Sequence, residues 1–312
     1  MICCEKCFKD SEIKAIIKGL NIIGECQTCG KRNVSIYDTE QNSELVDNFN
    51  ELLEVYTPIS NLPEDFPKEK ANLLKDELND RWQIFNIDKE KIYTVIRNIC
   101  REKYEEIPEL FDSPISITAL YNNDYLLENS LLKTYEWENF VEEIKNVNRF
   151  HTNYINTHIL DNFCKFATTA YKKGAVFYRA RISDEYGYTD KEMGAPPPGK
   201  ASDGRANPLG ISFLYLASDK ETTLHEIRAS TYDYVTIGRY ELKEDIDVVD
   251  FIALDRISPF SPIDLELHAV NKGHLKKISN EIAKPLRRSD SSLDYLPTQY
   301  ITDFIKSKGH RG

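Results

Sequence analysis

Three side chains in the C-terminal half of the chain could together act on a nucleotide. Arg179 lies in a strand-like run at 176–181, Tyr215 lies in another at 211–216, and Glu226 follows eleven residues later. An arginine fork pairs bidentately with phosphate oxygens, and a tyrosine can stack on a ring or hydrogen-bond to ribose. A carboxylate stabilises the oxocarbenium-like state through which an N-glycosidic bond breaks. The three residues therefore predict cleavage of an N-glycosidic bond in a phosphorylated substrate.

Short elements must position these side chains. The loop at 192–208 is rich in Pro and Gly, and a loop of this length in a compact domain is usually functional or disordered. Strand patterns of β-branched and aromatic residues predict four strands, at 176–181, 211–216, 234–240 and 247–251.

The helix that presents Glu226 has a start signal of its own. Ser218 and Glu221 have the Ser-x-x-Glu spacing of a capping box, so we expect the helix to open at Ser218. Leu224 and Ile227, three residues apart, should then face the core, which leaves Glu226 on the other side.

These motifs resemble those of the RES family of bacterial NAD-degrading toxins, which is named for an Arg, a Glu and a Ser. The resemblance covers 174–312. It rests on Phe177-Tyr178-Arg179-Ala180-Arg181, Met193-Gly194-Ala195-Pro196-Pro197, Gly204-Arg205-Ala206-Asn207-Pro208, Tyr215-Leu216-Ala217, Glu226 and Asp294-Tyr295-Leu296-Pro297-Thr298-Gln299. It implies a mixed α/β domain related to the ADP-ribosyltransferase fold, with two apposed sheets and a cleft for NAD. It also implies a toxin or defence effector that cleaves the nicotinamide–ribose bond of NAD, as a glycohydrolase or, with phosphate as acceptor, a phosphorylase.

The resemblance assigns roles residue by residue. Arg179 matches the family arginine and should anchor the dinucleotide, Tyr215 matches its aromatic residue, and Glu226 matches its glutamate. Three weaker candidates would line the pocket and bind the dinucleotide: Arg181, Arg205 and Asn207.

The family serine has no assigned position in this sequence. In the family it follows a Gly-rich turn on a last strand, and this chain stops at 310–312, where that strand should begin. We therefore expect the domain to lack its last strand. The serines near this end that could stand in are Ser289, Ser291, Ser292 and Ser307.

Four N-terminal cysteines predict a structural metal site. Cys4-x2-Cys7 and Cys26-x2-Cys29 are 18 residues apart, and Gly30 supplies the positive φ that a knuckle turn needs. Four thiolates at about 2.3 Å satisfy tetrahedral Zn²⁺ with no open position. A redox role for the two CxxC pairs is the alternative, but no βαβ pattern surrounds them.

The middle of the chain has helical periodicity from about Ser43 to Tyr171. Apolar faces recur at three- and four-residue spacing. We expect them at Leu45/Phe49/Leu52/Leu53/Tyr56, Leu73/Leu74/Leu78/Trp82, Ile92/Val95/Ile96/Ile99, Trp137/Phe140/Ile144/Val147 and Ile159/Phe163/Phe166. The arrangement resembles the HEPN-like helical regions that precede RES domains, although the Arg–His spacing of a HEPN ribonuclease is absent.

The sequence thus predicts an α+β protein of three parts: a Cys4 zinc ribbon at 1–38, an all-α domain at 39–172 and a RES domain at 173–312. Cys100 and Cys164 lie alone inside apolar patterns and should be small buried hydrophobes. With 312 residues, 41% of them apolar, the chain can bury a sizeable core.

The composition of the chain limits the classes of partner that we expect for it. The net charge of −11 argues against sequence-blind nucleic-acid binding. No apolar run could span a bilayer and no secretory signal opens the chain, so we expect a cytoplasmic protein without a membrane partner. The expected partners are NAD, an antitoxin or regulatory protein, and further copies of the chain.

Two other functions fit the same residues. A protein ADP-ribosyltransferase needs the same arginine and carboxylate, but it often has an acidic residue or Gln two positions before the glutamate, where this chain has Leu224. The third reading is a zinc-ribbon scaffold or binding protein whose RES domain has decayed.

Overall fold

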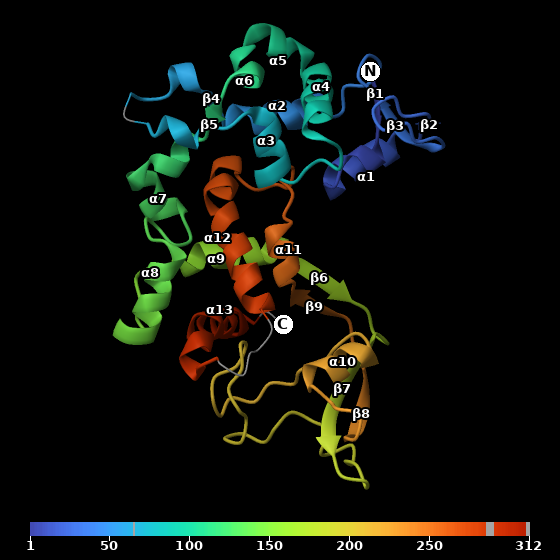
Figure 1. The fold of residues 1–312 in the computed structure, drawn as a ribbon, viewed down its shortest axis with the longest axis vertical. Helices are drawn as coiled ribbons and strands as arrows, with labels where there is room; N and C mark the ends of the chain where they lie inside the picture. Colours follow the sequence, from blue (N-terminus) through green and yellow to red (C-terminus); the bar gives the residue numbers. More distant parts are fainter. Residues whose placement is uncertain (65, 285–289, 310–312) are drawn as a thin grey trace. The chain divides into compact units, whose positions relative to one another are not determined.

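The computed structural model describes residues 1–64, 66–284 and 290–309. The chain forms two compact units, and each is built from two segments of the sequence (Figure 1). The first unit consists of Met1–Thr134 and Arg256–His274, and the second of Tyr135–Asp255 and Leu275–Gly312. Helix α12 (Leu265–Ala283) contributes residues to both. The three predicted domain boundaries remain predictions.

The first unit begins with a small antiparallel sheet. Its strands are β1 (Ile2–Cys4), β2 (Ile23–Gly24) and β3 (Val34–Asp38), in the order β1-β3-β2. Helix α1 (Ser11–Gly19) follows β1, and its N-cap Asp10 accepts two backbone N–H bonds at 3.0 Å. The cap fixes the start of α1 and so the path of the chain between the two cysteine pairs.

The rest of the first unit is largely helical. Its buried core includes Phe49, Phe85 and the Ile92–Ile99 face of one helix, as the three- and four-residue spacing predicted. The remaining elements are α2 (Val46–Glu54), α3 (Leu74–Asp76), α4 (Lys89–Ile99), α5 (Arg101–Glu106), α6 (Glu109–Asp112), α7 (Asn123–Asn129) and the paired strands β4 (Thr57–Pro58) and β5 (Ile115–Ser116).

The second unit holds two antiparallel strand pairs among its described residues. Strand β7 (Val176–Ser183) pairs along its whole length with β8 (Tyr234–Glu241), and β6 (Thr168–Tyr171) pairs with β9 (Ile246–Val249). The helices are α8 (Trp137–Glu142), α9 (Thr157–Phe166), α10 (Lys220–Glu226), α11 (Phe251–Asp255) and α13 (Leu296–Ser307). Strand β6 lies where the periodicity predicted helix, because its pairing with β9 supplies the backbone hydrogen bonds that a helix would otherwise provide.

The strand expected at 211–216 does not form. Only Ala217 meets β7, where it exchanges two backbone hydrogen bonds of 2.8 Å with Tyr178. The preceding residues form their hydrogen bonds elsewhere. The Ile211 carbonyl accepts from the Asn207 amide at 3.1 Å, and the Ser212 side-chain hydroxyl donates to the Pro196 carbonyl at 2.5 Å. Hydrogen bonds to a loop have therefore replaced a strand ladder.

Two helical faces end earlier than predicted. Val147 is 74% exposed because α8 continues into a wider π turn at Glu143–Val147, which rotates the following side chains out of the apolar phase. Phe166, the last residue of α9, is 44% exposed. Cys100 and Cys164 are buried, as predicted. Among the described helices, none is both apolar enough and long enough to cross a bilayer.

Candidate active site and metal centre

Two of the predicted site arginines lie on β7 and hold the loop that follows it. The Arg179 guanidinium donates to the Gly194 carbonyl at 2.9 Å, and Arg181 donates to the Glu192 carbonyl. Burial lowers the pKa of Arg179, yet an arginine stays a cation at neutral pH. The side chains at 179 and 181 are two apart, so they leave the same face of the strand. This face carries the Pro-rich loop.

Tyr240 supports the same loop and was missed by the sequence analysis. Its hydroxyl donates to the Met193 carbonyl, one residue before the carbonyl that Arg179 holds. Tyr240 lies on β8 directly opposite Phe177 of β7. The residue pattern at 234–240 predicted a strand that includes Tyr240, but only the pairing register of β8 with β7 shows which loop Tyr240 meets.

Helix α13 holds the second part of the loop through buried polar side chains. The Gln299 amide donates to the carbonyls of Gly204 (2.8 Å) and Asn207 (3.1 Å). The hydroxyls of Thr298 and Thr302 donate to the next two carbonyls, those of Arg205 and Ala206. Buried polar groups of this kind must be hydrogen-bonded, and here their partners are the backbone of the loop. The sequence shows that Thr298, Gln299 and Thr302 are polar residues on one face of a helix, but it does not show that this face anchors the loop.

Asn207, predicted to line the dinucleotide pocket, is 3% exposed and fully engaged within the loop. Its amide nitrogen donates to the carbonyls of Ser202 (2.8 Å), Pro208 (3.2 Å) and Ile211 (3.1 Å). Its amide oxygen accepts the Tyr215 hydroxyl at 2.5 Å. In this structure Asn207 therefore organises the loop.

Tyr215 is fixed at its hydroxyl end and is half exposed. Burial of the phenol raises its pKa, so the hydroxyl remains a donor to Asn207 at neutral pH. A Cβ on Gly204 would lie 3.2 Å from this hydroxyl, which explains why the loop has glycine where it passes the tyrosine. The residue as a whole is 52% exposed.

Arg205 is placed by an acidic and an aromatic residue. Its guanidinium forms an ion pair with Asp290 at 3.2 Å, and both side chains are 15% exposed. The guanidinium carbon also lies 5.3 Å from the centre of the Tyr295 ring. The Arg205 side chain thus faces the segment before α13.

Helix α10 begins at a different residue from the one predicted. Asp219 is the N-cap and accepts the Thr222 N–H at 2.7 Å, whereas the Ser218 hydroxyl contacts Asp219. A carboxylate one residue later is the stronger acceptor. The buried face of α10 also differs from the predicted one. Thr223 is 4% exposed, while Leu224 and Ile227 are only partly buried.

Glu226 is the last residue of α10 and is exposed. Helix α10 contacts β7, and the Lys220 ammonium at its start lies 5.6 Å from the Tyr178 ring centre. Tyr178 and Arg179 are neighbours on a strand and so point to opposite faces. Within the described residues, no hydrogen bond or ion pair joins Glu226 to Arg179. The structure brings Tyr215 and Asn207 into contact, but not Glu226 and Arg179.

The serines near the end of the chain have local partners. Ser291 accepts the Leu293 N–H at 3.2 Å and opens the turn before α13, and Ser307 donates to the Phe304 carbonyl at 2.6 Å. Ser292 is the first residue of that turn, and Ser289 lies outside the described residues.

The four cysteines predicted to bind metal converge. Their sulfur atoms all lie within 4.8 Å of one another, and three of the separations are 3.8 Å (Cys4–Cys7), 3.6 Å (Cys4–Cys29) and 3.6 Å (Cys7–Cys26). A tetrahedron with metal–sulfur bonds of about 2.3 Å has edges of about 3.8 Å, so the cluster fits a tetrahedral ion. Gly30 has φ of 72° after the second pair, as expected.

Without a bound cation, burial disfavours the thiolate form of Cys4 and Cys7. It raises the pKa of Cys4 to about 12 and that of Cys7 further. A bound cation reverses this preference because it stabilises the deprotonated sulfur. Metal binding at the four cysteines should therefore release protons.

Comparison with known families identifies the C-terminal part of the chain. The model of the RES domain matches residues 176–312, a range that includes β7, the loop, α10 and α13. RES domains are generally associated with NAD-related toxin functions. No curated protein and no solved structure gives a match. Residues 176–312 of this chain belong to the RES domain family.

Proposed function

We propose that the RES domain consumes NAD by breaking the bond between nicotinamide and ribose. The observation that carries the proposal is the RES match at 176–312; the sequence resemblance adds Arg179 and Glu226 as counterparts of the family's arginine and glutamate. In the reaction, the C1′–N bond breaks and nicotinamide leaves with the bonding pair. Water then adds at C1′ and loses a proton to give ADP-ribose, or phosphate adds to give its 1-phosphate.

We assign each residue the role of its counterpart in the family. Glu226 is exposed and has no hydrogen bond or ion pair within the described chain, so its carboxylate is available to stabilise a ribosyl cation. Arg179 supplies positive charge beside the loop at Gly194, where a diphosphate could displace the carbonyl. Tyr215 is half exposed as a residue and would offer its ring for stacking.

The test uses purified full-length protein and NAD labelled in the adenosine half. The wild type should release nicotinamide together with free labelled ADP-ribose, or with its phosphate when phosphate is present. Glu226→Gln should lower turnover by at least about 100-fold, as loss of a group that stabilises transition-state charge typically does. Label on protein would instead favour the ADP-ribosyltransferase alternative.

Matched controls separate chemistry from folding. Glu221 is an exposed carboxylate on the same helix, so Glu221→Gln should keep full activity. Arg239 lies on β8 opposite Tyr178 and pairs with Glu241 at 3.0 Å. Its substitution Arg239→Lys is the control for Arg179→Lys. Equal turnover in wild type and Glu226→Gln, or no turnover in either, would contradict the proposal.

We further propose that the ion at the cysteine cluster is zinc. The support is the set of four sulfur donors within 4.8 Å of one another, three of whose separations are 3.6–3.8 Å, since all-sulfur tetrahedral sites are typical of structural Zn²⁺. Such a site has no open position and holds the first strands together without taking part in NAD chemistry.

A further inference from the structure

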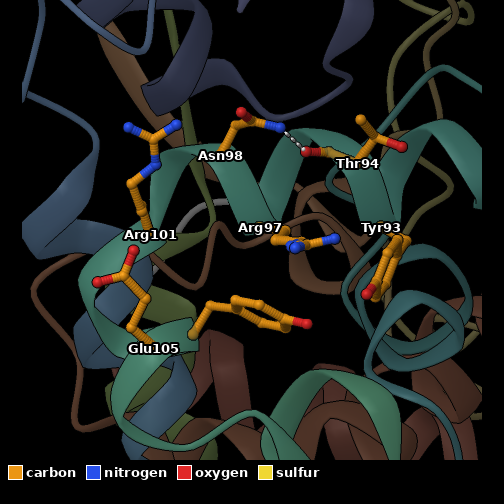
Figure 2. A pocket seen from close by; sticks show the side chains of 7 residues that line it. Tyr93, Thr94, Arg97, Asn98, Arg101 and Glu105 are labelled. Carbon is orange, nitrogen blue, oxygen red and sulfur yellow. Dashed lines mark hydrogen bonds between the residues drawn. The ribbon is translucent and has the colours of Figure 1, made fainter.

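A polar cavity lies outside the RES domain, on α4 and α5 of the first unit. Its volume is about 410 Å³, within the usual range for small-molecule sites. Tyr93 and Arg97, four residues apart, lie on one face of α4, and Arg101 opens α5 after a break in the helix at Cys100. Figure 2 shows these three residues lining the cavity, with the Arg97 and Arg101 side chains pointing in different directions. The opposite face of α4, which includes Ile92 and Ile96, is buried in the core.

The cavity presents two guanidinium groups that internal ion pairs do not neutralise. Arg97 and Arg101 are both exposed, and neither forms an ion pair with a carboxylate in the described part of the chain. The Arg97 guanidinium lies 4.2 Å from the centre of the Tyr104 ring, which holds its planar fork in place. In a protein of net charge −11, these two arginines are positive charges without an ion pair among the described residues and can meet an anion, although Glu105 lines the same cavity.

The tyrosine rings of the cavity are fixed from behind. Asp112 accepts hydrogen bonds from the hydroxyls of both Tyr93 (2.7 Å) and Tyr104 (3.2 Å). The hydrogen bond to Asp112 raises the pKa of Tyr93 to about 12, so this phenol stays neutral and cannot repel an anion. The structure thus supplies two rigid, uncharged rings beside two cations.

We propose that this cavity binds a small phosphorylated ligand of the nucleoside-phosphate class. The guanidinium forks would take the phosphate oxygens, and a tyrosine ring would take the base or sugar face. Asn98, whose amide donates to the Thr94 carbonyl at 2.8 Å, lies between the two arginines and adds a polar wall.

One feature of the cavity opposes an anion and gives a sharp test. Glu105 lines it and is exposed, and its carboxylate repels phosphate. Removing that charge should tighten binding, an outcome that an unfolded variant cannot produce.

The experiment is calorimetric titration of the full chain with ADP, inorganic pyrophosphate and adenosine at low salt. ADP should bind and adenosine should not, while pyrophosphate should bind more weakly than ADP because it lacks a ring to stack. Arg97→Gln and Arg101→Gln should each weaken ADP binding about tenfold or more, as loss of a charge-assisted hydrogen bond does. Glu105→Gln should tighten it several-fold, and binding should weaken as salt rises.

The controls keep this site apart from the proposed NAD site. Arg32 of the first unit, 80% exposed and paired with Glu25, provides the control Arg32→Gln, which should bind ADP as the wild type does. Arg179→Lys should leave this binding event in place even if it abolishes turnover of NAD. ADP binding unchanged in both Arg97→Gln and Arg101→Gln, or adenosine binding as tightly as ADP, would overturn the proposal.

Discussion

The Tyr215 hydroxyl donates to the Asn207 amide oxygen at 2.5 Å, while the amide nitrogen of the same asparagine holds three loop carbonyls. Tyr215 is therefore positioned by Asn207, a residue predicted from the sequence to bind the ligand. Asn207 connects the loop at 202–211 to Tyr215, and α13 holds the same loop through Gln299. The position of the tyrosine ring thus depends on elements almost 100 residues apart in the sequence.

Asn207→Ala should destabilise the protein more than Tyr215→Phe. The alanine removes the Asn207 donor from the Ser202 and Ile211 carbonyls, while the Pro208 carbonyl keeps the Ile211 N–H. It should lower the free energy of unfolding by about 2–4 kcal/mol, whereas the phenylalanine loses one hydrogen bond worth about 1 kcal/mol. Urea unfolding of the full chain measures both. Asn146→Ala, which removes an exposed amide bonded to Glu142, is the control and should change stability by less than about 0.5 kcal/mol. Equal costs for Asn207→Ala and Tyr215→Phe would contradict the loop-organising role.

Cys26→Ser should abolish metal binding at the N-terminal cluster, while Cys3→Ala should retain it. Cys3 is buried next to the cluster, but its sulfur is not one of the four that converge. Elemental analysis of purified protein should give one zinc per chain for wild type and Cys3→Ala. Zinc retained at full stoichiometry in Cys26→Ser would show that the four sulfurs are not the site.

Chelation of this metal should become easier as the pH falls. The ligands must be thiolates, and protons compete with the ion for each sulfur. The zinc affinity of the wild type, measured with a competing chelator, should drop steeply between pH 7 and pH 5. The N-terminal strands should lose protection from hydrogen exchange when zinc is removed, because the four cysteines join the end of β1 to the segment between β2 and β3.

His268 should make the protein less stable in mild acid. Burial, and to a lesser extent the nearby Lys272 ammonium, lowers its pKa from 6.5 to about 3. The unfolded chain therefore binds a proton below pH 6.5 that the folded chain does not. The stabilising contribution is complete above pH 6.5 and falls as the pH drops toward 3, at about 1.4 kcal/mol per pH unit.

The check is the free energy of unfolding of His268→Phe at pH 7 and pH 5. Phenylalanine keeps a ring against Trp82, which now lies 5.1 Å from the His268 ring. Relative to the wild type, the variant should lose about 2 kcal/mol less on going from pH 7 to pH 5. The same pH dependence in both proteins would show that His268 is not the titrating group.

Asp219→Ala should weaken the helix that ends at Glu226, and Ser218→Ala should not. Loss of the N-cap carboxylate, which accepts the Thr222 N–H at 2.7 Å, should cost about 1 kcal/mol. Amide exchange along α10 measures the local effect. Faster amide exchange in Ser218→Ala than in Asp219→Ala would show that Ser218 caps the helix, as the sequence predicted.

The sequence alone determined the features that depend on neighbours a few residues apart. The helical faces at 45–56 and 92–99 are buried because their spacing matches the helix period. The strand at Val176–Arg181 formed and extends to Ser183. The two CxxC pairs with Gly30 indicated a metal site because each pair occupies one tight turn, and the RES motifs indicated the family because their order and spacing are written along the chain.

Only the tertiary structure decided which polar side chains are free to act. Asn207 and Arg205 had the chemistry of ligand-binding residues, but loop carbonyls and Asp290 engage them. The segment at 211–216 had a strand pattern, but hydrogen bonds to Asn207 and to the Pro196 carbonyl replaced its ladder. The fold also gathers Tyr93, Arg97 and Arg101 around one cavity, with Tyr104 beside Arg97. These contacts depend on how the loop and the helices fold, so the spacing of residues along the sequence carries no information about them.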